Sequence, residues 1–398
     1  MHLKYLTYLK EMTMEESIGI QPVKVSDRLL SLDVFRGITI AGMILVNNPG
    51  TWSAVYPPLR HAEWNGCTPT DLIFPFFLFI VGVAIPFALG KRVEKGDDHK
   101  KIILQIIRRS AILFLLGLIL AGFPFGLLGH NFNLAALRIP GVLQRIAIVY
   151  LIAAILFLKT NYKAQIYIGS ALLIIHCILM TLVPVPGVGY SNLEPTTNLA
   201  AWLDNALLEG HLWSSTKVWD PEGILSTMPA VVTAIMGMIT GWWLRKDKDK
   251  TTKTVWLFVI GSVCMTLGYI WDGWFPLNKS IWTSSYVLYT GGLALLFLGF
   301  CYWFIDVRNS KWWIKPFQVY GLNAIAVFFL SGLVGRLMYI IKVPSGNEDI
   351  GLSTFLFNNL FLSWLEPINA SLLWAIVYVL VWLGLMWILY AKKIFIKV

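Results

Sequence analysis

Charged residues are scarce in this chain. Only 14% of its 398 residues are Asp, Glu, Lys or Arg, whereas 57% are hydrophobic. A soluble domain carries roughly a quarter charged residues, so a soluble fold is excluded. Apolar runs close to the ~20 residues that cross a bilayer recur along the chain, and the ~10-residue alternating segments of a membrane barrel are missing. The sequence predicts an all-α, polytopic protein of the lipid bilayer.

Cysteine is also scarce, with four residues. Cys67 lies near the predicted outer face and the others lie inside predicted helices, so we expect no disulfide framework. No cysteine pair has metal-ligand spacing, and we expect no metal. The sequence contains no phosphate-binding loop, no Ser-His-Asp order and no basic surface interleaved with aromatics, which argues against nucleic-acid binding.

About ten membrane-spanning helices are predicted. Residues 1–28 form a polar N-terminal segment and residues 29–398 a single transmembrane domain. The apolar stretch 353–365 is too short to span, and we expect it to lie in the interface or to re-enter. The predicted spans are 30–48, 72–91, 109–126, 141–159, 164–184, 225–244, 254–273, 283–305, 316–341 and 370–391.

Basic residues predict the orientation. If the N-terminus is inside, most of the 32 lysines and arginines fall in inner segments, as the positive-inside rule requires. Both termini should therefore be cytoplasmic, and the net charge of +10 reports topology. The loop 185–224 then faces outward, and AAWLDNALLEGHLW within it predicts a short amphipathic helix.

His61 lies just before the second predicted span, in the outer stretch PPLRHAEWNGCTPTDLIFPFFLFIVG. Imidazole is the side chain best suited to proton transfer near neutral pH, although a lone loop histidine is usually only a surface residue. Thr68-Pro69-Thr70-Asp71 predicts a helix start, in which Asp71 is a cap rather than a catalyst.

The first span, SLDVFRGITIAGMILVNNPG, carries polar residues on one face. Asp33 and Arg36 are three residues apart, and Asn47 lies about three turns further along that face. Polar groups at membrane depth either pair or line a cavity. These residues could therefore face a functional cavity. The alternative is structural: Asp33 and Arg36 form an ion pair that anchors one end of the helix, and Asn47 and Asn48 cap its C-terminal end.

Two further outer segments carry candidate substrate-binding residues. In WDPEGILSTMPA, Asp220 is predicted as N-cap and Pro221 as the first helical residue, and Glu222 could still bind a cationic sugar amine. The second segment is the outer turn in GYIWDGWFPLNKSIWTSSYVLYTGG, residues 268–292. Its aromatic side chains and amide groups would suit a sugar ring, although an aromatic belt at the membrane interface is the commoner explanation for tryptophans there. The candidates there are Asn278, Lys279 and Trp282.

The remaining polar candidates are weaker. Arg138 and Arg145 flank a Pro-Gly turn at the outer end of the fourth span, where they would bind an anionic partner or form an internal ion pair. The other histidines are expected to be a satisfied core residue (His176), exposed cytoplasmic residues (His2 and His99) and outer-loop residues (His130 and His211).

Several segments together resemble one family of transmembrane acetyltransferases. The resemblance to the heparan-α-glucosaminide N-acetyltransferase family runs from about Arg28 to the C-terminus, with the motifs in the expected order. The segments that carry it are LSLDVFRGI, HAEWNGCTPTDLIFPFFLFIVG, RIPGVLQRIAI, DPEGILST, NKSIWTSSYVL and YAKKIFIKV.

The resemblance implies a mechanism. Family members use cytoplasmic acetyl-CoA to acetylate the amine of a terminal glucosamine on the far side of the membrane. The catalytic histidine of the family matches His61, and an assisting asparagine matches Asn47, with Asn48 as the near alternative. His61 would act as general base or form an acetyl-imidazole, and Asn47 would orient the ring or stabilise the oxyanion.

The resemblance also implies a site for acetyl-CoA and a homodimer. Inner basic residues would hold the CoA phosphates, although each is also explained as a topology signal. These candidates are Arg36, Arg108, Arg109 and Arg245.

One departure and one alternative accompany this hypothesis. Lysosomal members carry an extended soluble segment before the first matching helix, whereas only residues 1–28 stand there. We therefore expect a bacterial inner-membrane protein that acts on free glucosamine, a cell-wall sugar or a glycan fragment. The alternative is an amino-sugar transporter, in which Pro75 and Pro86 mark a broken helix. The lack of an inverted repeat argues against it.

Overall fold

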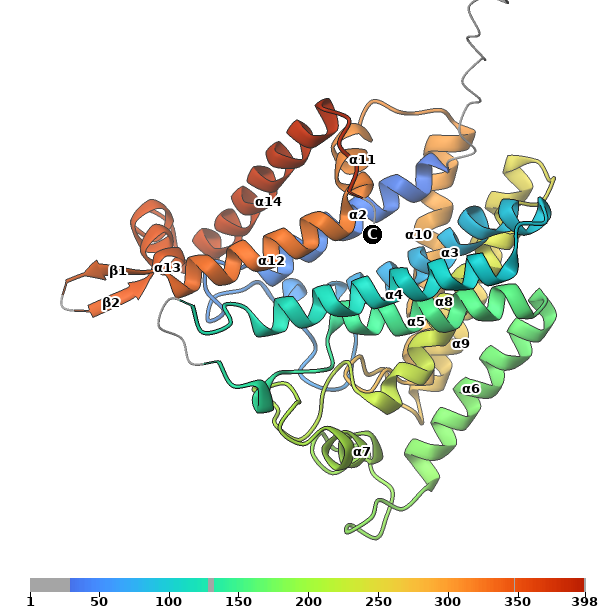
Figure 1. The fold of residues 1–398 in the computed structure, drawn as a ribbon, viewed down its shortest axis with the longest axis horizontal. Helices are drawn as coiled ribbons and strands as arrows, with labels where there is room; N and C mark the ends of the chain where they lie inside the picture. The colour runs from blue at the N-terminus through green and yellow to red at the C-terminus, as the bar shows by residue number, and fades with distance from the viewer. Residues whose placement is uncertain (1–28, 128–131, 347, 397–398) are drawn as a thin grey trace, which may run out of the picture.

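The computed structural model describes residues 29–127, 132–346 and 348–396. Almost all of the regular secondary structure in this part of the chain is helical, which confirms the predicted fold class (Figure 1). The strands that the described residues form are β1 (Lys342–Ser345) and β2 (Glu348–Gly351), an antiparallel pair with Lys342 opposite Gly351.

Within the described residues, nine helices are long and apolar enough to cross a membrane. The protein is therefore an integral, multi-pass membrane protein. The helices follow the predicted spans closely, except that α4 begins at His99, well before residue 109, because its polar first turns continue the helix. They are α2 (Leu30–Asn47), α3 (Ile73–Glu94), α4 (His99–Gly122), α5 (Val142–Lys159), α6 (Tyr162–Leu182), α8 (Ile224–Leu244), α9 (Lys250–Asp272), α10 (Ser284–Tyr302) and α14 (Pro367–Ala391).

A tenth span is broken. α11 (Lys315–Leu322) and α12 (Ala324–Ile340) meet at Asn323 with a bend of 82°. Asn323 donates through Nδ2 to the Ile394 carbonyl and accepts through Oδ1 from the Ile396 amide. The predicted span over 316–341 is therefore divided into two helices at Asn323.

The break that the transporter alternative places at the prolines of the second span is absent. α3 runs continuously from Ile73 to Glu94 with Pro86 inside it. Pro75 stands in the first turn, where proline fits because the amide there has no helical partner. The transporter-type broken helix proposed at Pro75 and Pro86 was therefore wrong.

Several shorter elements accompany the long helices. α7 (Leu199–Leu208) confirms the helix predicted in the long outer loop. The stretch 353–365 folds mostly as α13 (Leu352–Phe357) and the π-helical turn η6 (Asn358–Leu362) that follows it. Elsewhere in the chain, another π-helical turn, η5 (Trp303–Val307), extends α10. Residues 353–365 are too short to span, as predicted, and their depth in the membrane stays a prediction.

Small residues let α3 and α8 pack closely at the centre of the bundle. A Cβ atom on Gly82 would lie 2.1 Å from the Ala234 carbonyl oxygen, and one on Gly237 would lie 2.1 Å from that of Phe79. Such backbone approach is the usual packing of membrane helices. The buried side chains around this contact, Leu78, Phe79 and Ile80 among them, form the core that supports the outer loops.

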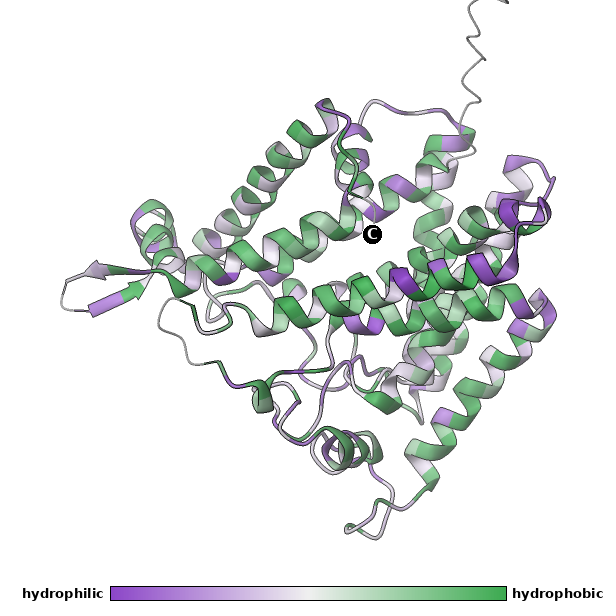
Figure 2. Ribbon diagram, in the orientation of Figure 1, coloured by the Kyte–Doolittle hydropathy of each residue, from purple (hydrophilic) through white to green (hydrophobic). Residues whose placement is uncertain are grey.

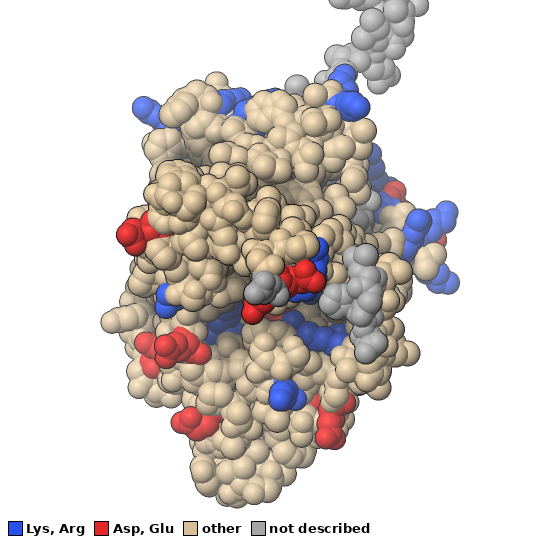
Figure 3. All heavy atoms as spheres, turned by 90° about the vertical axis from the view of Figure 1, so that its left-hand side faces the viewer, with Lys and Arg blue, Asp and Glu red and all other residues tan. Residues whose placement is uncertain are grey.

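The two ends of the bundle differ in character. The turns that join α3 to α4, α5 to α6 and α8 to α9 gather at one end and are strongly hydrophilic (Figure 2). The opposite end carries the β1–β2 pair and opens into a hollow where basic and acidic side chains both lie (Figure 3). Which end faces the cytoplasm stays a prediction.

Candidate active site

The loop after α2 and the start of α3 place the first polar cluster. η1 (Pro57–Leu59) and η2 (Pro69–Leu72) are single helical turns that bring the His61 segment back over α3. Asp71 and Thr68 form a capping box, as the sequence predicted, in which the Thr68 amide and hydroxyl each lie 3.0 Å from Asp71 Oδ2. The Ala62 amide donates to the same oxygen at 3.0 Å.

The second oxygen of Asp71 contacts His61. His61 Nδ1 lies 2.6 Å from Asp71 Oδ1. The Asp71 side chain is only 1% exposed, whereas that of His61 is 47% exposed. Asp71 is thus held by the cap and in turn fixes the imidazole, which presents its other edge to the solvent side. The sequence predicted the cap alone and missed this pairing.

Lys279 completes the cluster from the turn between α9 and α10. Its Nζ lies 3.0 Å from His61 Nδ1, 3.5 Å from His61 Nε2 and 3.5 Å from Asp71 Oδ1. Burial lowers the pKa of Lys279, although the charges of Asp71 and Glu222 favour its ammonium form. A fifth of its side chain, 21%, is exposed. The structure therefore brings Lys279 to His61.

Cys67 lies beside the cluster without the character of a nucleophile. Burial, and then the charge of Asp71, raise the pKa of the Cys67 thiol to about 12, while Lys279 acts in the opposite direction. A thiol with this pKa is protonated at neutral pH, and the thiolate is the reactive form. The chemistry of the cluster therefore centres on His61.

His61 opens into a cavity of about 460 Å³, which we call the His61 cavity. Aromatic side chains form one wall, where Trp64 and Trp219 pack edge to face with ring centroids 5.2 Å apart. The polar residues that line the cavity include Asn47, His61, Asp71, Arg138, Glu222 and Lys279. A cavity lined by aromatic side chains and a few polar groups is typical of a small-molecule site.

Arg138 and its carboxylates form the far side of this cavity. Arg138 donates to both oxygens of Asp220, at 2.8 and 2.6 Å, and to Glu222 Oε2 at 2.6 Å. This confirms the internal ion pair considered for Arg138. The prediction of Asp220 as helix N-cap was wrong, because α8 begins at Ile224 with Gly223 in the cap position, and Asp220 instead receives Arg138 and the Trp213 amide.

Several other predicted residues lie in the core. Asn278 is fully buried and donates to Asn65 Oδ1 at 3.1 Å, and Trp282 is buried with its indole donating to Thr233 at 3.2 Å. The described lining of the His61 cavity includes neither residue, so their role in substrate binding stays a prediction. Arg145 is also buried, and its Nη2 donates to the Gly223 carbonyl at 3.1 Å.

The histidines other than His61 lie apart from the cluster. His176 is fully buried, which confirms that it lies in the core, but neither ring nitrogen finds a hydrogen-bond partner among the described residues, so the expectation that it is satisfied was wrong. His211 Nδ1 lies 2.8 Å from the Leu137 carbonyl oxygen. His99 is exposed at the start of α4, while His2 and His130 lie outside the described residues.

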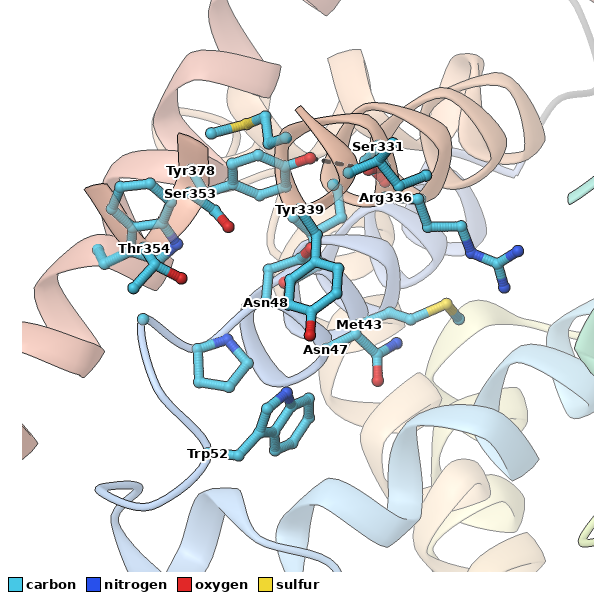
Figure 4. Close-up of a pocket in the computed structure, with 18 of the residues that line it drawn as sticks. Met43, Asn47, Asn48, Trp52, Ser331, Arg336, Tyr339, Ser353, Thr354 and Tyr378 are labelled. Atoms are coloured by element: carbon cyan, nitrogen blue, oxygen red, sulfur yellow. Dashed lines mark hydrogen bonds between the residues drawn. The ribbon is translucent and has the colours of Figure 1, made fainter. Parts of the chain in front are cut away.

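A second, larger cavity adjoins the first, with a volume of about 790 Å³ (Figure 4). We call it the Arg336 cavity. Met43, Asn47 and Phe328 line both cavities, whereas Asn48 lines only this one of the two. Asn48 Nδ2 donates to the Ile44 carbonyl at 2.8 Å. Asn47 therefore stands between the two cavities, at the end of α2.

The basic residues proposed for CoA are scattered. Arg36 lies 3.0 Å from Asp33, Arg109 lies over the ring of Tyr150 at 4.9 Å, and Arg245 donates to both Glu94 oxygens at 2.9 Å. Arg108 is exposed on α4. The described lining of neither cavity includes any of the four, so their role in holding CoA stays a prediction.

Within the described ranges, no group of three or more His, Cys, Asp or Glu side chains is placed to hold a metal ion. The expectation of metal-free chemistry stays a prediction. The residues that face one another around His61 are instead an imidazole, a carboxylate and an amine, which are groups suited to proton transfer.

The fold and the site define a polytopic membrane protein with a buried carboxylate that orients an exposed histidine at one end of the helix bundle. Comparison with known sequences agrees with the motifs: residues 28–243 match the family described as "Domain of unknown function (DUF5009)", and two curated heparan-alpha-glucosaminide N-acetyltransferases are similar. The chain therefore belongs to the DUF5009 family, and its resemblance to the heparan-α-glucosaminide N-acetyltransferase family is confirmed.

These relatives are longer than the chain. The enzyme of Homo sapiens is 30% identical over 426 residues, which cover 93% of this chain and 60% of the human protein. The enzyme of Mus musculus is 30% identical over 353 residues, which cover 76% of this chain and 53% of the mouse protein. The chain thus matches between half and two thirds of each relative's length.

Proposed function

We propose that this protein is a transmembrane acetyltransferase that moves the acetyl group of acetyl-CoA to the amine of a glucosamine-type sugar. The observation that carries the proposal is the His61–Asp71 pair, with Nδ1 and Oδ1 2.6 Å apart, at the edge of an aromatic-walled cavity that also contains Asn47. The names of the curated relatives support the reaction class.

The chemistry follows from the pair. When Nδ1–H donates to Asp71, the lone pair of His61 is on Nε2, and Nε2 can take the proton that the attacking amine loses. The amine nitrogen forms a bond to the acetyl carbon, and the bond from that carbon to the CoA sulfur breaks. The imidazolium then returns its proton to the departing thiolate. Asp71 stabilises the imidazolium throughout, as an orienting carboxylate does in other enzymes.

Asn47 suits the role of oxyanion donor. Its amide lies at the boundary of the two cavities, where a thioester carbonyl could meet the amine held near His61. An amide that is aimed at the developing negative charge stabilises the tetrahedral intermediate. The apolar face of the sugar ring would bind to Trp64, Trp213 and Trp219. Glu222 would attract the amine in its cationic form, whose extra proton leaves to solvent before the neutral amine attacks.

The proposal includes a location and a direction. We propose that the protein resides in a bacterial inner membrane with both termini cytoplasmic, that acetyl-CoA arrives from the cytoplasm, and that the sugar binds from the other side. The strongly hydrophilic end of the bundle (Figure 2) supports this orientation, because its turns are rich in lysine and arginine and basic loops stay on the cytoplasmic side. A homodimer and the CoA contacts of the inner arginines belong to the same proposal.

The deciding experiment follows acetyl transfer from labelled acetyl-CoA to glucosamine with purified protein. We expect labelled N-acetylglucosamine from the wild type, and a rate lower by at least about 100-fold for His61→Ala and Asp71→Asn, the low end of a general-base contribution. His99→Ala is the matched control, because His99 is exposed on α4 and far from the cavity in sequence. Equal rates for His61→Ala and the wild type would contradict the role of His61.

The same protein without acceptor tests the rival covalent route. Label that remains on the wild-type protein after rapid quenching, and not on His61→Ala, would indicate an acetyl-imidazole intermediate. No label on either protein is the result that direct transfer predicts.

A further inference from the structure

His61 Nδ1 has two partners that cannot both be satisfied in the same way. Asp71 Oδ1 lies 2.6 Å from Nδ1. Lys279 Nζ lies 3.0 Å from Nδ1 and 3.5 Å from Nε2, so its shorter contact is the one with Nδ1. A ring nitrogen carries either a proton or a lone pair. A protonated Nδ1 donates to the carboxylate but cannot accept from an ammonium, whereas an unprotonated Nδ1 accepts from the ammonium and faces the carboxylate oxygen without a proton between them.

The two arrangements differ at Nε2, which carries a lone pair in one and a proton in the other. When Asp71 holds the Nδ1 proton, the neutral ring has its lone pair on Nε2 and is a competent base. When the Lys279 ammonium donates to Nδ1, the single ring proton must be on Nε2, which then cannot accept a proton from an amine. Which nitrogen carries the proton is set by the bond that the other nitrogen makes.

We propose that Lys279 is a positioning residue whose protonation state selects the tautomer of His61. This inference rests on the proposed function, in which Nε2 is the base. The protons balance as follows. The resting form holds Lys279 as ammonium, the ring proton on Nε2 and Asp71 as carboxylate; the active form holds Lys279 as amine, the ring proton on Nδ1 and Asp71 as carboxylate. The change releases one proton to solvent, so alkaline pH favours the active form.

The surroundings of Lys279 are consistent with a proton that can leave. Burial lowers the pKa of Lys279, with Asp71 and then Glu222 acting in the opposite direction. The charged or titratable groups that face it come from each segment packed against it, namely His61, Glu63, Cys67, Asp71, Arg138 and Glu222. Asp220 and Glu222 both bond to Arg138, so Asp71 is the carboxylate whose contact with Lys279 is direct.

Two substitutions separate this role from a purely structural one. Lys279→Arg keeps a positive charge at every accessible pH, so we expect the inactive tautomer to persist and kcat/KM to stay at least about 100-fold below wild type up to pH 10. Lys279→Met removes the charge while keeping an unbranched chain, so we expect it to exceed Lys279→Arg at every pH and to lack the alkaline limb of the wild-type profile. Lys217→Arg, at an exposed loop position, is the matched control.

A second measurement reads the tautomer without activity. Protein labelled with ¹⁵N-histidine contains six imidazoles, and a spectrum of His61→Gln identifies the signals of His61. We expect the wild type to change from an Nε2–H to an Nδ1–H ring as pH rises, Lys279→Met to show Nδ1–H throughout, and Lys279→Arg to show Nε2–H throughout. A wild-type tautomer that is independent of pH, or the same tautomer in both variants, would overturn the proposal.

The two proposals fail in distinguishable ways. If wild-type protein transfers no acetyl group to glucosamine, the reaction or the acceptor is wrong, while the NMR signals still report whether Lys279 sets the tautomer. If wild-type protein is active and Lys279→Arg and Lys279→Met lose activity together with an unchanged pH profile, the enzyme proposal stands and the inference about Lys279 is wrong.

Discussion

The two adjoining cavities differ in how their arginines are used. In the His61 cavity, Arg138 is bonded to Asp220 and Glu222, and Asp71 is bonded to His61. In the Arg336 cavity, the described lining contains no carboxylate, and the exposed guanidinium of Arg336 has no ion pair among the described residues (Figure 4). The first cavity is therefore held in one geometry by its own charges, whereas the second leaves its guanidinium available.

The largest expected difference between the two cavities is in the stability lost when the arginine of each is replaced. Arg138→Met would leave Asp220, whose side chain is fully buried, without its cation. Breaking a buried pair in this way costs about 3–5 kcal/mol, and since Arg138 is 28% exposed we expect about 3 kcal/mol, the low end. Thermal unfolding in detergent measures it. Arg336→Met is the matched control and should change stability by no more than about 0.5 kcal/mol. Equal destabilisation of the two would show that the cavities do not differ in this respect.

The next effect concerns the asparagines at the boundary. Asn47 lines both cavities and Asn48 lines only the Arg336 cavity, so we expect Asn47→Ala to lower kcat by about 100-fold, as the loss of an oxyanion donor does. Asn48→Ala should cause a small fraction of that loss, because its amide already donates to the Ile44 carbonyl. Steady-state rates with saturating acetyl-CoA distinguish the two. A greater loss for Asn48→Ala would move the oxyanion donor into the Arg336 cavity.

The smallest effect is a pH dependence beside the His61 cavity. Burial raises the pKa of Asp204 on α7 to about 6, although the hydrogen bonds that Asp204 accepts from the Ile224 and Asp220 amides act to lower this pKa. Because the folded pKa exceeds the usual 3.8, the stability that Asp204 contributes is present at low pH and is lost as pH rises through 6. We expect a loss of about 2 kcal/mol from pH 4 to 7 relative to Asp204→Asn.

Unfolding of both proteins across this pH range tests the sign. Other carboxylates titrate in both, so the difference between the two slopes isolates Asp204. A wild-type protein that gains stability relative to Asp204→Asn as pH rises would mean that Asp204 is charged in the folded state at all these pH values.

Span positions could be predicted from the sequence, because apolar length alone defines a membrane helix. The break at Asn323 could not, since one asparagine in an apolar run gives no sign of an 82° bend. The partner that stabilises it, the backbone of 394–396, is distant in sequence. Periodicity and hydropathy report local structure and do not identify such partners.

The candidate site was predicted in part. The motif identified His61, and spacing identified the cap at Asp71, but not that one carboxylate serves both. A helix cap uses only one carboxylate oxygen of Asp71 and leaves the other oxygen available. A histidine ten residues earlier in the chain was therefore the available indication that Asp71 could also bond to His61. The prediction for Asp220 was wrong because Asp-Pro-Glu also fits the start of a helix. In the structure, the carboxylates of Asp220 and Glu222 instead form ion pairs with Arg138. Tertiary ion pairs of this kind override local preference.

The bend at Asn323 also has a consequence for biosynthesis. Both amide atoms of Asn323 bond to backbone groups 71 and 73 residues later in the chain. A chain is synthesised from its N-terminus, so these bonds cannot form until the ribosome has passed Ile396. Until then α11 and α12 lack the contacts that fix their angle, and because both helices pack against α2, the wall that carries Asn47 is among the last parts of the bundle to be completed.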